Sequence, residues 1–164
     1  MFKNLFISFT AFFLLSSISY AQSFNDVSSS HPNYEAIESL KSYGIIKGYS
    51  DGSFKPANTV NRAEALKIIV MGSGVEVSSG VDFSGFPDVP ADAWFAPVLI
   101  KAKNLGIIKG DPNGNFAGER SINMAETLKI LLGASGVRIS FISPNERPYA
   151  DIDVAQWFSP YFQY

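Results

Sequence analysis

The chain has 164 residues, of which 46 % are hydrophobic and 17 % charged, and its formal net charge is −2. It contains no cysteine, which excludes a disulfide framework, a thiolate zinc site, a cysteine nucleophile and a lipid-modified cysteine anchor. The acidic balance argues against a nucleic acid or an anionic membrane as the partner, because both attract a surplus of Lys and Arg.

Residues 1–21 have the pattern of a secretory signal peptide. Lys3 supplies the positive charge, and an apolar stretch runs from Leu5 to Ile18. This stretch of about 14 residues is shorter than the roughly 20 that are needed to span a bilayer as a helix. The small residue Ala21 precedes a suitable cleavage point. We therefore expect export and cleavage after Ala21, with an uncleaved signal anchor as the alternative.

The rest of the chain repeats itself at an offset of 62 residues. A common offset in separate blocks indicates duplication of a whole structural unit. A third copy begins near residue 149 and stops with the chain. The connectors are rich in Gly, Ser and Val, which is typical of loops. We predict a first repeat at 22–79, a second repeat at 80–142 and the start of a truncated third repeat at 143–164.

The first repeat is predicted to contain two helices. Tyr34, Ile37 and Leu40 recur at helical spacing, which predicts a helix over 33–43 that ends before Gly44. A glycine-rich loop follows, and its Phe54 is expected to hold the loop to the core. The second helix opens with a capping box, a polar residue whose side chain pairs with the backbone three residues on and receives the reciprocal bond. The box residues are Asn61 and Glu64.

The second repeat follows the same order. A helix is predicted over 94–105, capped by Asp92 or a neighbour and ending before Gly106. Phe116 is the expected loop anchor, and the second helix opens with the capping box of Asn123 and Glu126. Each unit is a helix, a turn and a helix, which is too small to bury its own apolar faces. The fold class is therefore mainly α, built from tandem helix-turn-helix repeats.

The ordered motifs resemble the S-layer homology (SLH) family. The blocks that carry the resemblance are Phe24–Asp26, Gly44–Gly48, Asp51–Pro56 and Asn61–Glu64, and their second copies. The resemblance implies an exported protein held at the cell surface, in which three repeats form a pseudo-threefold helical bundle. Here the third repeat is expected to be truncated. It also implies that grooves between repeats bind a cell-wall polysaccharide, either an acidic, pyruvylated secondary wall polymer or another peptidoglycan-linked polymer.

Candidate ligand-binding residues follow from both lines of reasoning. Arg62 lies in the first turn of a helix, where free N–H groups and the helix dipole favour an anion, and its planar fork suits a carboxylate. Trp94 and Trp157 offer flat faces for a sugar. We expect Arg62 and Trp94 to share a groove at the first repeat junction. The full set implied by the resemblance is Arg62, Trp94, Asp26, Asp88, Gly48, Gly110 and Trp157.

Two departures from the family pattern affect this set. Met124 stands where the second repeat should have arginine, so that copy is expected to lose its grip on an acidic ligand. The first repeat has Pro32 and Asn33 where the second has tryptophan and phenylalanine. Structural roles are the alternative for every candidate: an exposed helix start for the arginine, packing for the tryptophans, and turns for the aspartates.

No catalytic constellation stands out, since the chain has no His-Glu-x-x-His motif and no phosphate-binding glycine motif. The loop 111–115 is only weakly similar to a calcium loop, because Phe116 and Ile122 stand where glycine and glutamate are needed. We therefore predict a wall-anchoring module that is not an enzyme and has no cofactor or metal. The alternatives are a self-assembling surface-layer component and a fragment of a wall-degrading glycoside hydrolase. Self-association or a C-terminal effector region is a further expectation.

Overall fold

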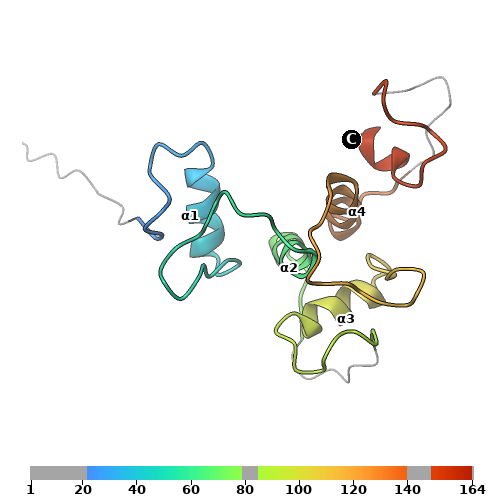
Figure 1. Ribbon diagram of the computed structural model, residues 1–164, viewed down its shortest axis with the longest axis horizontal. Helices are drawn as coiled ribbons and strands as arrows, with labels where there is room; N and C mark the ends of the chain where they lie inside the picture. The colour runs from blue at the N-terminus through green and yellow to red at the C-terminus, as the bar shows by residue number, and fades with distance from the viewer. Residues whose placement is uncertain (1–21, 79–84, 140–148, 164) are drawn as a thin grey trace, which may run out of the picture.

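The computed structural model describes residues 22–78, 85–139 and 149–163. The predicted signal peptide and both predicted repeat boundaries lie outside these ranges. Within them the chain forms helices α1 (Tyr34–Ser42), α2 (Arg62–Gly72), α3 (Ala96–Asn104) and α4 (Met124–Ala134) and the 3-10 helix η1 (Ser159–Gln163), without a strand (Figure 1). None of these helices is long and apolar enough to cross a bilayer. The prediction of a mainly α fold with tandem repeats is confirmed.

The short helices α1 and α3 end as the sequence predicts. Gly44 and Gly106 follow them with φ of 70° and 73°, a left-handed conformation that glycine adopts without a Cβ clash. The predicted cap at Asp92 is wrong, since α3 begins after Phe95, which makes no side-chain cap bond. The reason is local. The amide of Ala93 donates to Pro90 O at 3.0 Å, so a turn precedes the helix and moves its start along the chain.

The longer helices α2 and α4 begin with the two predicted capping boxes. The Glu64 amide donates to Asn61 Oδ1 at 2.8 Å, and the Asn61 amide donates to the Glu64 carboxylate at 2.9 Å. In α4 the corresponding distances for Asn123 and Glu126 are 2.9 and 3.3 Å. Each box satisfies two backbone donors, one at the cap residue and one in the first turn.

Each short helix and its loops form a small lobe with an aromatic centre. We call residues 22–56 the first lobe, 85–118 the second lobe and 149–163 the third lobe. The ring centres of Phe24 and Phe54 are 5.4 Å apart in the first lobe, and those of Phe86 and Phe116 are 5.8 Å apart in the second. These pairs join the start of each lobe to the loop after its short helix, so the loop anchors that the sequence predicts are present.

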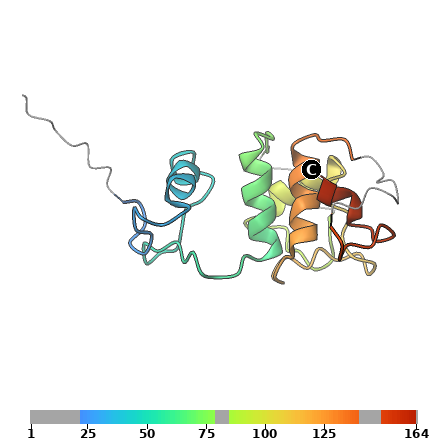
Figure 2. The same ribbon diagram turned by 90° about the horizontal axis from the view of Figure 1, so that it is seen from above.

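The long helices pack mainly across the repeats. Helix α2 packs against α3 and α4, and α4 packs against η1, while α1 lies apart from the other helices (Figures 1 and 2). The main core joins Ala63, Leu66 and Val70 of α2 to the second lobe, and Ile130 of α4 completes it. The first lobe has a separate small core, which Ile68 of α2 touches. A packing unit therefore consists of one repeat's long helix and the next repeat's lobe.

Backbone hydrogen bonds reinforce this junction. The amides of Arg62 and Ala63 donate to the carbonyl oxygens of Arg120 and Gly118 at 2.9 and 3.0 Å. An isolated antiparallel bridge joins Asn61 and Ser121 beside them. The start of α2 is thus fixed to residues 118–121, which we call the second-repeat loop. This contact positions the side chain of Arg62 relative to that loop.

Candidate functional site

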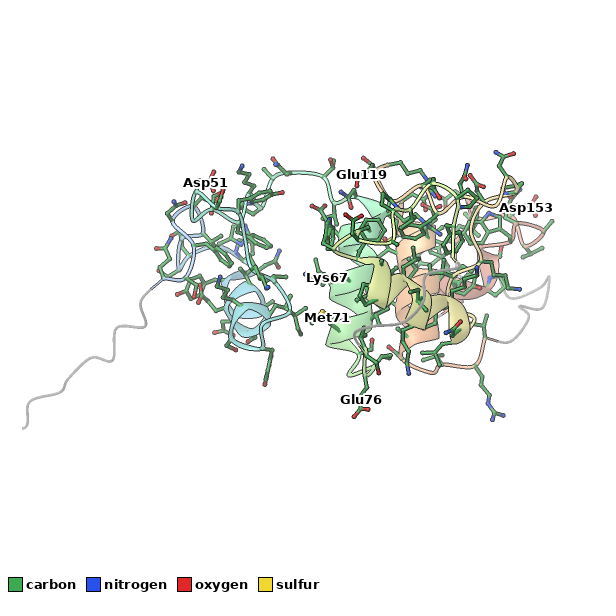
Figure 3. The ribbon with its side chains drawn as sticks, turned by 90° about the horizontal axis from the view of Figure 1, so that it is seen from below. Asp51, Lys67, Met71, Glu76, Glu119 and Asp153 are labelled. Atoms are coloured by element: carbon green, nitrogen blue, oxygen red, sulfur yellow. The ribbon has the colours of Figure 1, made fainter. Side chains whose placement is uncertain are left out.

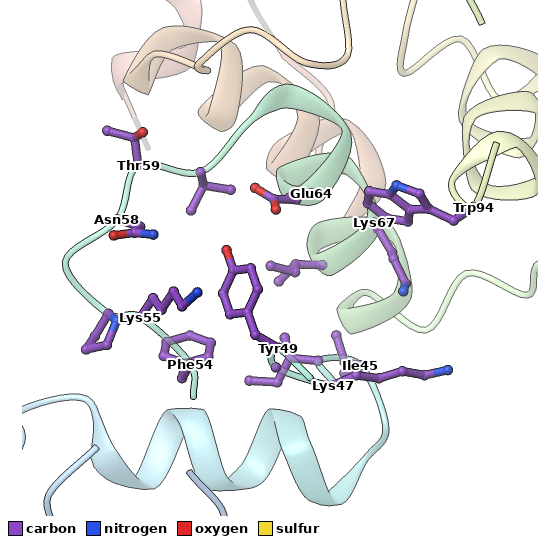
Figure 4. Close-up of a pocket in the computed structure, with 15 residues that line it drawn as sticks. Ile45, Lys47, Tyr49, Phe54, Lys55, Asn58, Thr59, Glu64, Lys67 and Trp94 are labelled. Atoms are coloured by element: carbon purple, nitrogen blue, oxygen red, sulfur yellow. The ribbon is translucent and has the colours of Figure 1, made fainter. Parts of the chain in front are cut away.

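Two pockets occupy equivalent places in successive repeats. The first, which we call the Trp94 pocket, has a volume of about 270 Å³ and lies between the first-lobe loop, α2 and Trp94 of the second lobe (Figure 4). The other, the Trp157 pocket, has about 290 Å³ and lies between the second-lobe loop, α4 and Trp157 of the third lobe. Each pocket is built from a lobe, the long helix that follows it and a tryptophan from the next lobe.

The Trp157 pocket has one more contributor, because Arg62 of the first repeat also lines it. The pocket therefore combines side chains from three repeats. The prediction that Arg62 and Trp94 share one groove is wrong, since the arginine lines the Trp157 pocket and Trp94 lines the other. Met124, the counterpart of Arg62 in the second repeat, lines neither pocket and is 67 % exposed. An arginine therefore lies beside the pocket loop of the second repeat, although that repeat has Met124 at the arginine position.

The side chain of Arg62 is held in the wall of the pocket. The residue is only 9 % exposed, and its guanidinium carbon lies 5.3 Å from the ring centre of Phe116. Its Nη1 is 3.4 Å from Glu126 Oε1, a distance typical of a loose ion pair. No acceptor among the described residues pairs with its buried Nε. Burial lowers the pKa of Arg62, with Glu126 opposing that effect. A buried guanidinium with an unpaired donor has hydrogen-bonding capacity to offer.

Arg120 and Glu126 form a second, tighter pair beside it. Arg120 Nη1 donates to Glu126 Oε2 at 2.8 Å, and Nη2 donates to Oε1 of the same carboxylate. These hydrogen bonds hold the pKa of Glu126 below its ordinary value, although burial opposes the effect. The same pairing raises the pKa of Arg120. The carboxylate therefore stays ionised and is gripped in the bidentate geometry that suits arginine.

Lysines accompany both tryptophans. Lys67 Nζ lies 5.1 Å from the ring centre of Trp94, and Lys129 Nζ lies 5.2 Å from that of Trp157. Both tryptophans remain about half exposed, at 54 and 53 %. Lys67 points from the side of α2 that faces the first lobe (Figure 3). Burial lowers the pKa of Lys129. Each pocket thus presents an accessible ring with an ammonium group beside it, an arrangement that suits a polar ligand with a flat apolar face.

The pockets are cationic although the whole chain is acidic. The Trp157 pocket is lined by four basic side chains, Arg62, Lys109, Arg120 and Lys129, against two acidic ones, Asp111 and Glu126. Three lysines and one glutamate line the Trp94 pocket. With a chain charge of −2, this local surplus marks the pockets as places where an anion is favoured.

The first three backbone amides of α2 are already hydrogen-bonded within the protein. The amides of Arg62 and Ala63 are already bonded to the second-repeat loop, and the amide of Glu64 is bonded to Asn61 Oδ1. The expectation that free N–H groups of this helix end would hold the ligand is therefore wrong. The donors available to a ligand at this point are therefore those of the Arg62 side chain.

Asp26 and Asp88 hold loops and line neither pocket. The carboxylate of Asp26 accepts from the amides of Phe54 and Lys55, both at 2.7 Å, which lowers its pKa. In the second lobe, Asp88 accepts from the amides of Phe116 and Ala117 at 2.9 and 2.7 Å. Burial raises the pKa of Asp88, but these bonds outweigh it and the net shift is downward. The geometry thus supports the turn-holding alternative for both residues.

Gly48 and Gly110 line the pockets, one in each. Their φ values are 74° and 82°. A Cβ at Gly48 would lie 2.2 Å from Phe24 Cε1, and one at Gly110 would lie 2.7 Å from Phe86 Cε1. Glycine is therefore required both by the left-handed backbone and by the close aromatic ring. These residues shape the pocket floor through their backbone.

The sequence reasoning missed several lining residues: Lys67, Lys129, Arg120 and Tyr49. The two lysines had a usable signal, because a Leu-Lys-Ile triplet recurs at 66–68 and 128–130, placing a charge inside an otherwise apolar run. Arg120 and Tyr49 had none. Their counterparts at the 62-residue offset are Asn58 and Asp111, so the repeat pattern does not single them out.

Comparison with known proteins finds one matching segment in each of the first two repeats. The sequence pattern of the S-layer homology domain matches residues 23–66 and 85–128. Over 131 residues the chain is 31 % identical to the "Surface-layer 125 kDa protein" of Lysinibacillus sphaericus, which covers 74 % of this chain and 11 % of that protein. It is 34 % identical over 88 residues to "Cell surface glycoprotein 1" of Acetivibrio thermocellus, covering 53 % of this chain and 4 % of that protein. A third relative is the "Amylopullulanase" of Thermoanaerobacterium thermosulfurigenes, 30 % identical over 71 % of this chain and 6 % of that protein.

This chain spans about a tenth or less of the length of these relatives. The two segments that match the domain pattern make up more than half of the sequence. They include both capping boxes and both pocket loops. The chain therefore belongs to the S-layer homology domain family.

Proposed function

We propose that this chain is a cell-surface anchoring module that binds an acidic cell-wall glycan non-covalently in the Trp157 pocket. The observation that carries the proposal is Arg62, a residue that is 9 % exposed in the wall of a cationic pocket and whose Nε has no acceptor among the described residues. A buried arginine with spare donors favours a carboxylate or phosphate, because the low local dielectric strengthens a charge-assisted hydrogen bond.

The relatives support anchoring over catalysis. The names of the first two describe surface-layer and cell-surface proteins, whereas that of the third describes an enzyme. A segment common to proteins with such different names is best explained by a task they share, and attachment to the envelope is such a task. Two SLH repeats without a recognisable catalytic constellation fit this interpretation.

In the proposed binding mode each side chain has a separate task. The guanidinium of Arg62 binds the anionic substituent of the polymer, and Lys129 adds a second positive charge. The half-exposed ring of Trp157 packs against the apolar face of the same sugar. The aromatic ring of Phe116 keeps the arginine in position. The polymer is held without any covalent step.

Co-sedimentation with purified cell walls tests the proposal. We expect Arg62→Ala and Trp157→Ala each to lower wall affinity by about tenfold or more, since each removes a charged or aromatic contact worth about 1.4 kcal/mol or more. Arg62→Lys should lie between wild type and alanine, because it keeps the charge and loses the planar fork. Walls whose carboxylates have been converted to amides with carbodiimide should bind weakly if carboxylates are the anionic groups.

Met124→Ala is the matched control, because Met124 is the repeat counterpart of Arg62 but is exposed and lines neither pocket. Its wall affinity should equal that of wild type. Circular dichroism of each variant establishes that the helices are retained. Unchanged sedimentation of Arg62→Ala would contradict the proposal, and so would release of reducing sugar from the walls by the wild-type chain.

Self-assembly into a surface layer is the second candidate function, and it rests on the surface-layer name of one relative. It is compatible with wall binding, because a lattice component also needs attachment. Light scattering across a range of concentrations distinguishes the two. Mass that rises with concentration in the absence of walls supports assembly, and a monomer at high concentration counts against it.

A further inference from the structure

The Trp157 pocket contains its own carboxylate, which competes for the arginines that a ligand would need. Glu126 is the group in question, and its side chain is only 15 % exposed. Two guanidiniums approach it, from Arg62 in α2 and from Arg120 in the loop before α4. A carboxylate has two oxygens, so the way they are shared decides how much of each positive charge remains for a ligand.

The sharing is unequal. Arg120 donates to both oxygens of Glu126, and the amide of Asn123 donates to Oε2 at 3.3 Å. Arg62 reaches only one oxygen, at 3.4 Å, without an aligned hydrogen bond, and its Nε has no described acceptor. The loop arginine therefore holds Glu126, and the buried arginine is left with unused donors.

The Trp94 pocket lacks a counterpart of Arg120 and allows a comparison. Asn58 occupies the position of Arg120 there, and Glu64 occupies that of Glu126. In the described part of the chain Glu64 serves its capping box, with the amide of Asn61 at 2.9 Å, and forms no ion pair. The carboxylate of that pocket thus has no ion-pair partner among the described residues, although both pockets have the same helix cap.

We propose that Arg120 is a positioning residue that makes the Trp157 pocket selective for an anionic substituent. By donating to both oxygens of Glu126, it prevents that carboxylate from forming a closed, hydrogen-bonded pair with Arg62. The inference rests on the proposed function and names the chemistry that this pocket selects, a carboxylate or a phosphate carried on a sugar. Without Arg120 the nearest cation for Glu126 is Arg62, and a closed pair between the two would leave the ligand to displace an internal carboxylate.

This role predicts coupling between residues 120 and 126. Arg120→Ala should weaken anion binding when Glu126 is present, because the freed carboxylate then pairs with Arg62. Glu126→Gln removes that competitor, and glutamine at the third helical position still forms a capping box. In the Glu126→Gln background the loss of Arg120 should therefore have little further effect. A residue that contacted the ligand directly would instead cost the same in both backgrounds.

Tryptophan fluorescence can report on this pocket alone. The chain has two tryptophans, so a Trp94→Phe chain emits only from Trp157, which lines the pocket in question. In this background the chain, its Arg120→Ala and Glu126→Gln variants and the double variant are titrated with glucuronate and with glucose 6-phosphate. Glucose serves as the uncharged control, and the two anions distinguish a carboxylate from a phosphate. Helix content and thermal midpoint are recorded for every variant.

We expect the parent to bind at least one anion more tightly than glucose. Arg120→Ala should lower that affinity by about threefold to tenfold, and the double variant should match Glu126→Gln alone. An equal loss on removing Arg120 in both backgrounds would overturn the positioning role and leave the proposed function intact. Failure of the parent to prefer either anion over glucose would overturn the anionic ligand itself, and this inference with it.

Discussion

At the scale of single residues, two glycines in the second-lobe loop allow backbone strain to be separated from steric clash. Gly110 and Gly114 have φ of 82° and 80°. A Cβ at Gly110 would lie 2.7 Å from Phe86 Cε1 and 2.9 Å from the carbonyl oxygen of Asn115, whereas nothing lies within 4 Å at Gly114. The two positions share a left-handed φ and differ in how closely other atoms approach them.

We therefore predict that Gly114→Ala costs about 1 kcal/mol of unfolding free energy, from the left-handed backbone alone. Gly110→Ala should cost about 1 to 3 kcal/mol more, because a ring and a backbone carbonyl must also move. Urea unfolding of both variants measures the difference. Equal costs would show that the loop relaxes around the added methyl group.

How far single residues could be predicted depends on the range of the interaction. The capping boxes are local, since cap and partner lie three residues apart, and both were predicted from the sequence. The partner of Arg62 is not local. The 62-residue offset identifies Met124 as its counterpart but carries no information on which loop the side chain reaches. The position of Arg62 in the Trp157 pocket follows only from the packing of α2 against the second lobe.

At the scale of the elements, α2 and α4 share a length and a capping box but differ at their first amides. The amides of Arg62 and Ala63 donate to carbonyl groups of the second-repeat loop. For Met124 and Ala125 no acceptor is found among the described residues. The first two amides of α2 are therefore locked by a neighbouring loop, whereas those of α4 have no acceptor in the described part of the chain.

Hydrogen exchange should reveal this difference. We predict that the amides of Arg62 and Ala63 exchange at least about tenfold more slowly than those of Met124 and Ala125, because exchange requires the loop contact to open. The cap-bonded amides of Glu64 and Glu126 are the internal control, since both donate to an asparagine side chain at 2.8 to 2.9 Å. Equal rates at the first two pairs would contradict the locked start of α2.

At the scale of the whole molecule, the main hydrophobic core does not coincide with a single sequence repeat. The main core takes residues from α2, the second lobe and α4, so it lies between residues 63 and 134 and crosses the predicted boundary at 79. The bounds of α1 and α3 were predicted to within about two residues from periodicity and stop signals, and the starts of α2 and α4 from their capping boxes. The pairing of lobes with long helices could not be predicted, because both copies contain an apolar lobe and an apolar long helix and the sequence does not say which lobe packs on which helix. The pseudo-threefold arrangement stays a prediction.

This difference between the core and the sequence repeat can be tested with fragments. We predict that a fragment of residues 57–139 unfolds cooperatively on heating, because it contains every member of the main core. A fragment of residues 22–78 has a complete sequence repeat but exposes Leu66 and Val70, which are fully buried in the intact chain. It should show a weak, broad transition. Circular dichroism measures both, and a sharper transition for 22–78 would contradict the packing described above.

The three-repeat origin of the Trp157 pocket has a consequence for how the chain is held together. Its lining residues Arg62, Gly110 and Trp157 are widely separated in the sequence. A glycan bound in the proposed mode would tie these distant points into one closed loop, as a disulfide does covalently in other exported proteins. For a chain that contains no cysteine, the wall polymer would then act as a reversible, non-covalent cross-link. Its stabilising effect would rise with the concentration of the polymer, and the chain would be most resistant to unfolding where it is attached.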